Sequence, residues 1–137
     1  MAYKKKIEQI QRCPFEYGLR VFDGKWKARI LCILSQHKPL RFRQLRSELG
    51  DITDAVLTGA LQELLTEGVI RREAFNEIPP RVEYCLTEKG ESAIPLLQDI
   101  CAWSRQQFTL DTSALLSPCR QCPKLNEEGL KDTETSE

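Results

Sequence analysis

This 137-residue chain has no apolar run long enough to cross a membrane and no excess of either charge. A transmembrane helix takes about 18 or more consecutive apolar residues, so no membrane partner is expected. The start, Met1-Ala2-Tyr3-Lys4-Lys5-Lys6, lacks the apolar core and cleavage site of a signal peptide, and we expect a cytoplasmic protein. Because 20 Lys and Arg balance 20 Asp and Glu, the whole chain is not expected to bind polyanions indiscriminately.

Histidine is scarce, with His37 as its one occurrence, and no cluster of residues resembles a reaction centre. The chain is therefore not predicted to be an enzyme, no catalytic residue is assigned, and no cofactor is expected. The Cys119-x-x-Cys122 pair leaves three alternatives open. It supplies half of a four-ligand zinc site that a second subunit would complete, it forms a reversible disulfide, or it lies in a plain tail loop.

What the chain does contain is a series of helix-like segments over its middle part. Its length fits one domain with tails, which we place at residues 13–110, after an amphipathic arm at 1–12 and before a flexible tail at 111–137. Cys32 and Cys101 are predicted to be small core residues. Apolar residues at helical spacing predict helices at residues 14–24, 26–36, 43–49, 53–67 and 88–109.

Two of these helices form a helix-turn-helix pattern. Residues 43–49 and 53–67 are separated by a short turn that contains Gly50, which matches that layout. Thr53 is suited to cap the second helix, and the carboxylate of Asp54 suits its first turn. The apolar face of this helix, expected to pack inward, comprises Val56, Leu57, Ala60, Leu61, Leu64 and Leu65.

A hairpin follows directly. Residues 69–75 and 81–87 have the character of strands, and Pro79-Pro80 belongs in the turn between them because proline donates no backbone hydrogen bond. Residues 40–42 are expected to add a short edge strand. A strand pair with an arginine-bearing turn, placed after a helix-turn-helix, is typical of a winged helix. Nucleic acid is therefore the first partner to consider.

The last predicted helix has a wide apolar face for the outermost helix of so small a domain. We therefore expect a homodimer in which the second subunit covers this face, and the alternative is packing within one chain. The face consists of two neighbouring lines, Ile94, Leu97, Cys101 and Phe108 on one and Ala93, Leu96, Ile100 and Trp103 on the other.

A set of short motifs runs in order along residues 13–103. They are Cys13-Pro14, Gly24-Lys25-Trp26, Leu40-Arg41-Phe42, Leu45-Arg46, Leu57-Thr58, Leu61-Gln62-Glu63-Leu64, Gly68-Val69-Ile70, Pro79-Pro80-Arg81-Val82-Glu83-Tyr84, and Leu86-Thr87 with Gly90. Through them the chain resembles the HxlR-type family of bacterial transcriptional regulators, relatives of the MarR regulators. The resemblance implies a mainly helical α+β fold: a winged helix-turn-helix with a two- or three-stranded wing sheet and N- and C-terminal dimerisation helices. It also implies a homodimeric regulator, more a repressor than an activator, that binds double-stranded DNA at an inverted-repeat operator.

By this resemblance, helix 53–67 enters the major groove, where its early residues reach the base edges. Its outward positions are Thr53, Asp54, Ala55, Thr58, Gly59 and Gln62. The segment from Gly50 to Gly68 contains no Lys or Arg, whereas a basic residue near the start of this helix is usual in the family. Attraction to phosphate is therefore expected from residues outside it, namely Lys25, Lys27, Arg41, Arg43, Arg46, Arg72, Asn76 and Arg81.

Arg81 is the side chain most expected to contact DNA from the wing, in the minor groove or on the adjacent backbone. The alternative is an ion pair with Glu77 or Glu83. A DNA contact predicts that Arg81→Ala weakens operator binding and makes its salt dependence shallower.

Cys13 precedes Pro14 at a helix start, where backbone N–H groups and the helix dipole favour a thiolate. In several members of the family a cysteine at this motif senses oxidants, quinones or aldehydes, so the resemblance implies that Cys13 is a sensor thiol for an oxidant or electrophile. The alternative is a half-buried cysteine without a signalling role. Two rival functions also stay open: a thiol-redox or zinc-binding protein that uses Cys119 and Cys122, and a winged helix that serves protein–protein contacts.

Overall fold

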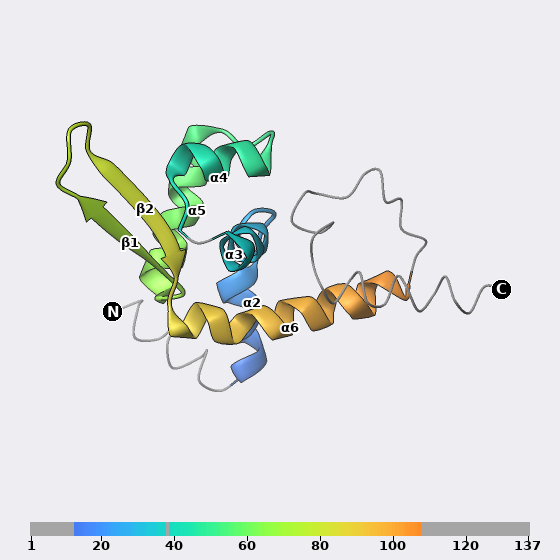
Figure 1. The fold of residues 1–137 in the computed structure, drawn as a ribbon. Helices are drawn as coiled ribbons and strands as arrows, with labels where there is room; N and C mark the ends of the chain where they lie inside the picture. The colour runs from blue at the N-terminus through green and yellow to red at the C-terminus, as the bar shows by residue number, and fades with distance from the viewer. Residues whose placement is uncertain (1–12, 38, 108–137) are drawn as a thin grey trace.

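The computed structural model describes residues 13–37 and 39–107. It is mainly helical, with one two-stranded antiparallel sheet, which confirms the predicted fold class. In chain order the elements are α2 (Pro14–Phe22), α3 (Lys27–Gln36), α4 (Phe42–Leu49), α5 (Asp54–Glu67), β1 (Ile70–Phe75), β2 (Arg81–Leu86) and α6 (Glu88–Arg105) (Figure 1). The predicted arm at 1–12 and the tail with Cys119 and Cys122 lie outside the described residues. Among the helices described, none is both long and apolar enough to span a bilayer.

The two helices of the helix-turn-helix, α4 and α5, begin and end for local reasons. The Thr53 hydroxyl accepts a hydrogen bond from the Val56 N–H at 3.2 Å, which confirms the predicted N-cap of α5. Gly68 ends α5 in the left-handed conformation, at φ 74°, that glycine adopts readily. α4 begins at Phe42, one residue before the predicted start, and the Arg41 N–H donates to Gln44 Oε1 at 2.9 Å in its first turn.

The sheet is the predicted hairpin with a small addition. β1 and β2 pair in antiparallel register from Ile70 opposite Leu86 at the base to Phe75 opposite Arg81 at the loop end. Leu40 joins β2 through a single bridge to Tyr84, with backbone hydrogen bonds of 3.0 and 2.7 Å. The expected edge strand at residues 40–42 is thus reduced to one bridging residue, because the chain turns into α4 at Phe42.

The core lies around α3, which contributes Ile30, Leu31, Ile33 and Leu34 and is seen almost end-on in the centre of Figure 1. The prediction of a core position is wrong for two residues. Val56 is 46% exposed because it lies on the outer side of the first turn of α5, and Cys101 is exposed on α6. Cys32 packs against the core as expected.

α6 is fixed to the start of the hairpin by close backbone contact. The Thr87 hydroxyl donates to the Gly68 carbonyl at 2.6 Å and accepts from the Gly90 N–H at 3.2 Å, so Thr87 caps α6 as predicted. Gly90 is buried, and a Cβ atom at this position would overlap the Val69 carbonyl oxygen. This contact determines where the long helix leaves the wing.

Candidate nucleic-acid interface

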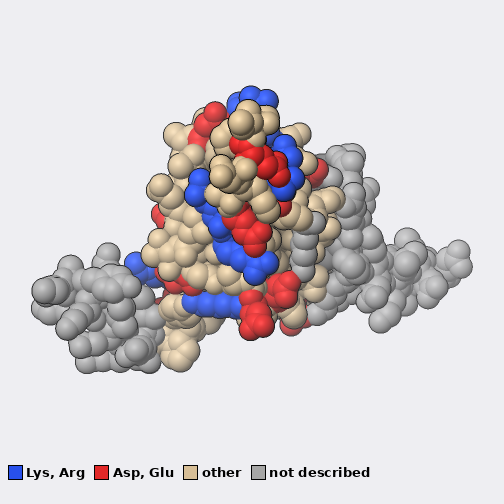
Figure 2. Space-filling view, turned by 60° about the vertical axis from the view of Figure 1, so that its left-hand side comes forward, with Lys and Arg blue, Asp and Glu red and all other residues tan. Residues whose placement is uncertain are grey.

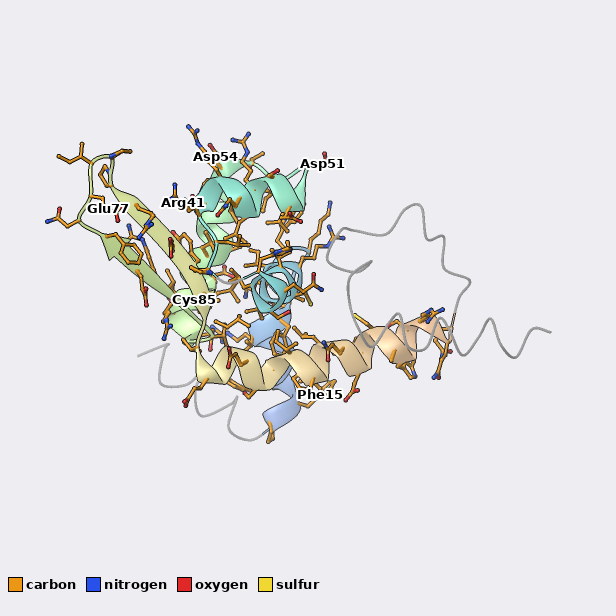
Figure 3. All side chains as sticks on the ribbon, in the orientation of Figure 1. Phe15, Arg41, Asp51, Asp54, Glu77 and Cys85 are labelled. Atoms are coloured by element: carbon orange, nitrogen blue, oxygen red, sulfur yellow. The ribbon has the colours of Figure 1, made fainter. Side chains whose placement is uncertain are left out.

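Three elements reach the same end of the molecule, away from α6. In Figure 1, α4, the first turn of α5 and the loop of the hairpin all lie at the top, whereas α6 runs along the bottom. Figure 3 places Asp51 and Asp54 at this end, with Glu77 near the hairpin loop and Arg41 between α4 and the hairpin. The start of a helix beside a wing is the arrangement with which winged helices meet a DNA duplex.

Most of the predicted base-reading positions of α5 lie on its exposed side. Thr53, Asp54, Ala55, Thr58 and Gln62 are exposed, while Gly59 is half-buried. The outer side of the helix thus offers two hydroxyls, one amide and one carboxylate. Val56 adds an apolar group there.

The carboxylate of Asp54 is paired with a cation from the preceding helix. Arg46 Nη1 lies 2.9 Å from Asp54 Oδ1, and both side chains are more than half exposed. The exposed side of α4 beside this pair has a shallow, open hollow lined by Arg43, Arg46, Ser47 and Gly50. Two of the predicted phosphate-contacting residues, Arg43 and Arg46, therefore line one open depression next to the start of α5.

Lys27 is the predicted phosphate contact that the fold uses internally. Its ammonium lies 2.8 Å from Glu63 Oε2 and 3.2 Å from Asp23 Oδ1, and it donates to the Arg20 carbonyl at 3.3 Å. Only 12% of the side chain is exposed. Burial lowers the pKa of Lys27, but its hydrogen bonds to Glu63 and Asp23 and their negative charges outweigh burial and raise that pKa overall. Lys27 thus links the end of α2 and the start of α3 to α5, and its ammonium is engaged within the fold.

Lys25 and Arg29 flank an indole ring at the start of α3. The Lys25 ammonium lies 4.7 Å from the centre of the Trp26 ring and the Arg29 guanidinium 5.3 Å from it. Lys25 is exposed and Arg29 is half-buried. The indole stabilises both cations by cation–π attraction while Lys25 stays accessible.

The wing holds its arginine more tightly than the sequence suggested. Arg81 Nη2 lies 3.2 Å from Glu77 Oε1, and its guanidinium stacks 4.2 Å from the centre of the Phe75 ring. Arg81 Nε lies 3.3 Å from Glu83 Oε1, an ion pair without hydrogen-bond geometry. The ion-pair alternative is therefore what the structure shows in the free protein. Arg72 and Asn76 are exposed.

The charges on the wing side are mixed. Figure 2 looks onto the hairpin and shows Lys and Arg side chains interleaved with Asp and Glu along it. Among the described residues visible in this view, no uniform basic patch forms. This agrees with the zero net charge and favours selective contacts over a general polyanion surface.

Besides the exposed Cys101, two half-buried cysteines lie at a helix start and in the hairpin. Cys13 is the half-buried N-cap residue of α2, and its carbonyl accepts the Glu16 N–H at 3.0 Å. Cys85 lies opposite Arg71 in the hairpin, where Arg71 Nε donates to Cys85 Sγ at 2.9 Å. This hydrogen bond raises the pKa of Arg71. In the described part of the chain, no group of three or more His, Cys, Asp or Glu is arranged to hold a metal ion.

A second surface faces away from the wing loop and is apolar. It is formed by α2 and α6, which the hydrogen bond from Lys89 to the Tyr17 hydroxyl joins at 2.6 Å. One of the two predicted apolar lines of α6 packs inward through Leu97 and the partly buried Ile94. The other line stays open with part of α2: Phe15 (71% exposed), Leu19, Leu96, Ile100 and Trp103 (64%). Figure 3 shows Phe15 below α6.

Two exposed apolar residues at the wing end were not predicted as site residues. Val56 continues the apolar pattern of α5, and this pattern predicts an inward position for it, but Val56 is 46% exposed. Ile78 is fully exposed at the hairpin loop, next to Pro79 and Pro80. The signal in the sequence was a large apolar residue directly before Pro79-Pro80, because a residue in such a turn is expected to be exposed.

The chain matches known proteins over most of the described region. A family model described as HxlR-like helix-turn-helix matches residues 21–112. An uncharacterised HTH-type transcriptional regulator of Halalkalibacterium halodurans is 40% identical over 101 residues, which cover 74% of this chain and 89% of that protein. The structure of the redox regulator HypR in its oxidised form matches with a TM-score of 0.65 at 34% identity, covering 72% of this chain and 100% of that chain. The reduced form of the transcriptional regulator YodB from B. subtilis matches with a TM-score of 0.63 at 28% identity, covering 69% and 91%.

Proposed function

The chain belongs to the HxlR-like helix-turn-helix family of transcriptional regulators, and we propose that it is a homodimeric repressor that binds an inverted-repeat operator in double-stranded DNA. One observation carries this proposal: α4, the start of α5 and the wing loop lie at one end of the molecule (Figure 1), and α4 bears a hollow there lined by Arg43 and Arg46. A duplex that receives α5 in its major groove would meet the wing on the neighbouring groove or backbone.

Base reading in this proposal comes from short polar and apolar groups. Gln62 is suited to adenine and Thr58 to several bases, and the exposed Val56 and Ala55 offer contacts for thymine methyl groups. Phosphate contacts come from Arg41, Arg43, Arg46 and Lys25. Because these cations lie on other elements than α5, the general attraction to DNA and the reading of sequence are divided between different parts of the fold.

The direct test is a selection from randomised duplexes followed by binding measurements. Wild-type protein should enrich a two-fold symmetric sequence and bind it with an affinity that falls steeply with salt, as phosphate contacts require. A shuffled duplex of the same composition is the control. Equal affinity for the selected and shuffled duplexes would contradict sequence-specific binding, and no salt-dependent binding to either would favour a winged helix that serves protein contacts.

The open face of α2 and α6 supports a homodimer. It exposes five large apolar side chains at the end opposite the wing loop, so a second copy can cover them without blocking DNA. An inverted repeat is the DNA counterpart of such a two-fold protein.

Regulation through Cys13 extends the proposal. Its position as the N-cap of α2 leaves the thiol half exposed next to the apolar α2–α6 face, so a modified Cys13 can change how two subunits meet. The similar structures include a protein described as a redox regulator. Diamide or methylglyoxal should release wild-type protein from the selected duplex and leave Cys13→Ser bound. Cys32→Ser is the matched control, and a Cys13→Ser protein that responds like wild type would remove Cys13 as the sensor.

A further inference from the structure

The start of α5 presents a negative charge where a DNA-binding helix would be expected to present a positive one. Asp54 is the first residue of α5 and is exposed at the end proposed to face DNA (Figure 3). Taken alone, its carboxylate repels phosphate. The structure shows that it does not stand alone, because Arg46 Nη1 lies 2.9 Å away across the turn of the helix-turn-helix.

The ion pair adds little to stability beyond the favourable place of the Asp54 carboxylate in the first turn of α5. Arg46 and Asp54 side chains are 53% and 64% exposed, and ion pairs in such surroundings contribute little to folding. What the pair does change is where the arginine lies. A free surface arginine samples many rotamers, and ordering it on binding costs conformational entropy. A carboxylate that already holds one guanidinium nitrogen removes part of that cost.

The guanidinium of Arg46 lies beside the open hollow on α4. Arg46 lines the hollow on α4 together with Arg43, Ser47 and Gly50. A guanidinium has five N–H groups, so pairing with Asp54 leaves donors for a second acceptor. The residues around this shallow depression carry two guanidinium groups and one hydroxyl, which can complement the charge and the oxygen acceptors of a phosphodiester in the DNA backbone.

We propose that Asp54 is a positioning residue that holds the Arg46 guanidinium over the hollow formed with Arg43 and Ser47, and that this hollow seats a backbone phosphate at the start of α5. The inference rests on the proposed DNA-binding function. According to this inference, an acidic residue increases the affinity for DNA. The test is therefore whether removing the charge of Asp54 weakens or strengthens DNA binding.

The experiment measures binding of full-length variants to the selected duplex over a salt series. Asp54→Asn should weaken binding about two- to tenfold, because Arg46 is no longer held. Asp51→Asn is the matched control: it removes the same charge from an exposed position in the turn before α5, and it should leave affinity unchanged or raise it. Arg46→Ala should weaken binding and lower the salt slope by about 0.9, the value for one lost phosphate contact.

The double variant shows whether Asp54 acts through Arg46. In the Arg46→Ala background, Asp54→Asn should no longer weaken binding, and Asp54→Glu in the otherwise wild-type protein should recover most of the affinity. Unchanged melting temperatures establish that the variants fold. Asp54→Asn binding that matches or exceeds Asp51→Asn, or an Asp54 effect that persists without Arg46, would overturn the inference while wild-type binding still supports the proposed function. Absence of salt-dependent DNA binding by wild-type protein would refute that function itself.

Discussion

At the scale of single residues, the basic side chains divide by what they touch in the folded chain. Lys27 and Arg81 are held by carboxylates, Lys25 lies over an indole ring, and Arg43 and Arg46 line an exposed hollow. The distribution of charge along the sequence predicted a basic region, but it did not predict which basic side chains are held within the fold and which stay exposed. Glu63, the partner of Lys27, comes from a helix two elements later, and only tertiary packing brings the two together.

Lys27→Met should lower the free energy of unfolding by about 1 kcal/mol at neutral pH, since it breaks a partly buried ion-pair cluster. The pKa of Lys27 is raised in the folded protein. Its stabilisation is therefore fully present below the unfolded-state pKa of about 10.4 and is lost as pH rises through the higher folded-state pKa. Urea unfolding of both proteins at pH 8 and at alkaline pH measures this, and a difference that stays constant across that range would contradict the prediction.

The Arg81→Ala variant tests the role of the wing, and the contacts of Arg81 in the structure change the result that we expect. Two carboxylates and the Phe75 ring already hold this guanidinium, so we expect the substitution to weaken DNA binding by loosening the wing loop while the salt slope stays close to wild type. A slope lowered by about 0.9 would instead show that Arg81 exchanges Glu77 for a phosphate on binding, as the sequence alone suggested. Arg72→Ala, at an exposed position of β1, is the comparison variant.

At the scale of helices and strands, local chemistry made most of the fold predictable. Thr53, Gly68 and Thr87 have their capping roles because these depend on residues three or four positions away. The wrong predictions concern which face of a helix is buried, not where the helix lies in the sequence. Val56 fits the apolar period of α5 but lies on its outer side, and Cys101 fits α6 but is exposed, because neighbouring elements and not the period decide which part of a wide face is covered.

Gly90→Ala should be destabilising although alanine is the better helix former. Helix propensity alone favours alanine by about 1 kcal/mol, but the added Cβ would overlap the Val69 carbonyl oxygen and push α6 away from the hairpin. Gly59→Ala is the matched control, since a Cβ there meets nothing within 4 Å, and it should be stabilising by a similar amount. Urea unfolding of the two variants should give opposite signs. A stable Gly90→Ala protein would show that α6 is not held by this contact.

At the scale of the whole molecule, the chain has two ends with different chemistry. Polar and charged groups surround the start of α5 and the wing loop, while α2 and α6 expose Phe15, Leu19, Ile100 and Trp103 at the other end (Figure 1). The sequence indicated the first surface through the helix-turn-helix and wing pattern, and the second through the wide apolar face of the last helix. The sequence did not show that these two surfaces lie far apart. Their separation depends on the directions in which the hairpin continues from Gly68 and α6 continues from Thr87.

Trp103→Glu should therefore convert a dimer into a monomer without unfolding the winged helix. Trp103 is 64% exposed in the single chain, so the charge disturbs no core packing, but it would be buried unpaired in a dimer. Sedimentation velocity measures the change, with Thr66→Glu as a control that adds the same charge to an exposed position on α5. Affinity for a full inverted repeat should fall far more than affinity for one half-site, because in a dimer the second half-site is bound at a high effective concentration. Equal losses for both duplexes, or a wild-type protein that sediments as a monomer, would show that the α2–α6 face does not serve dimerisation.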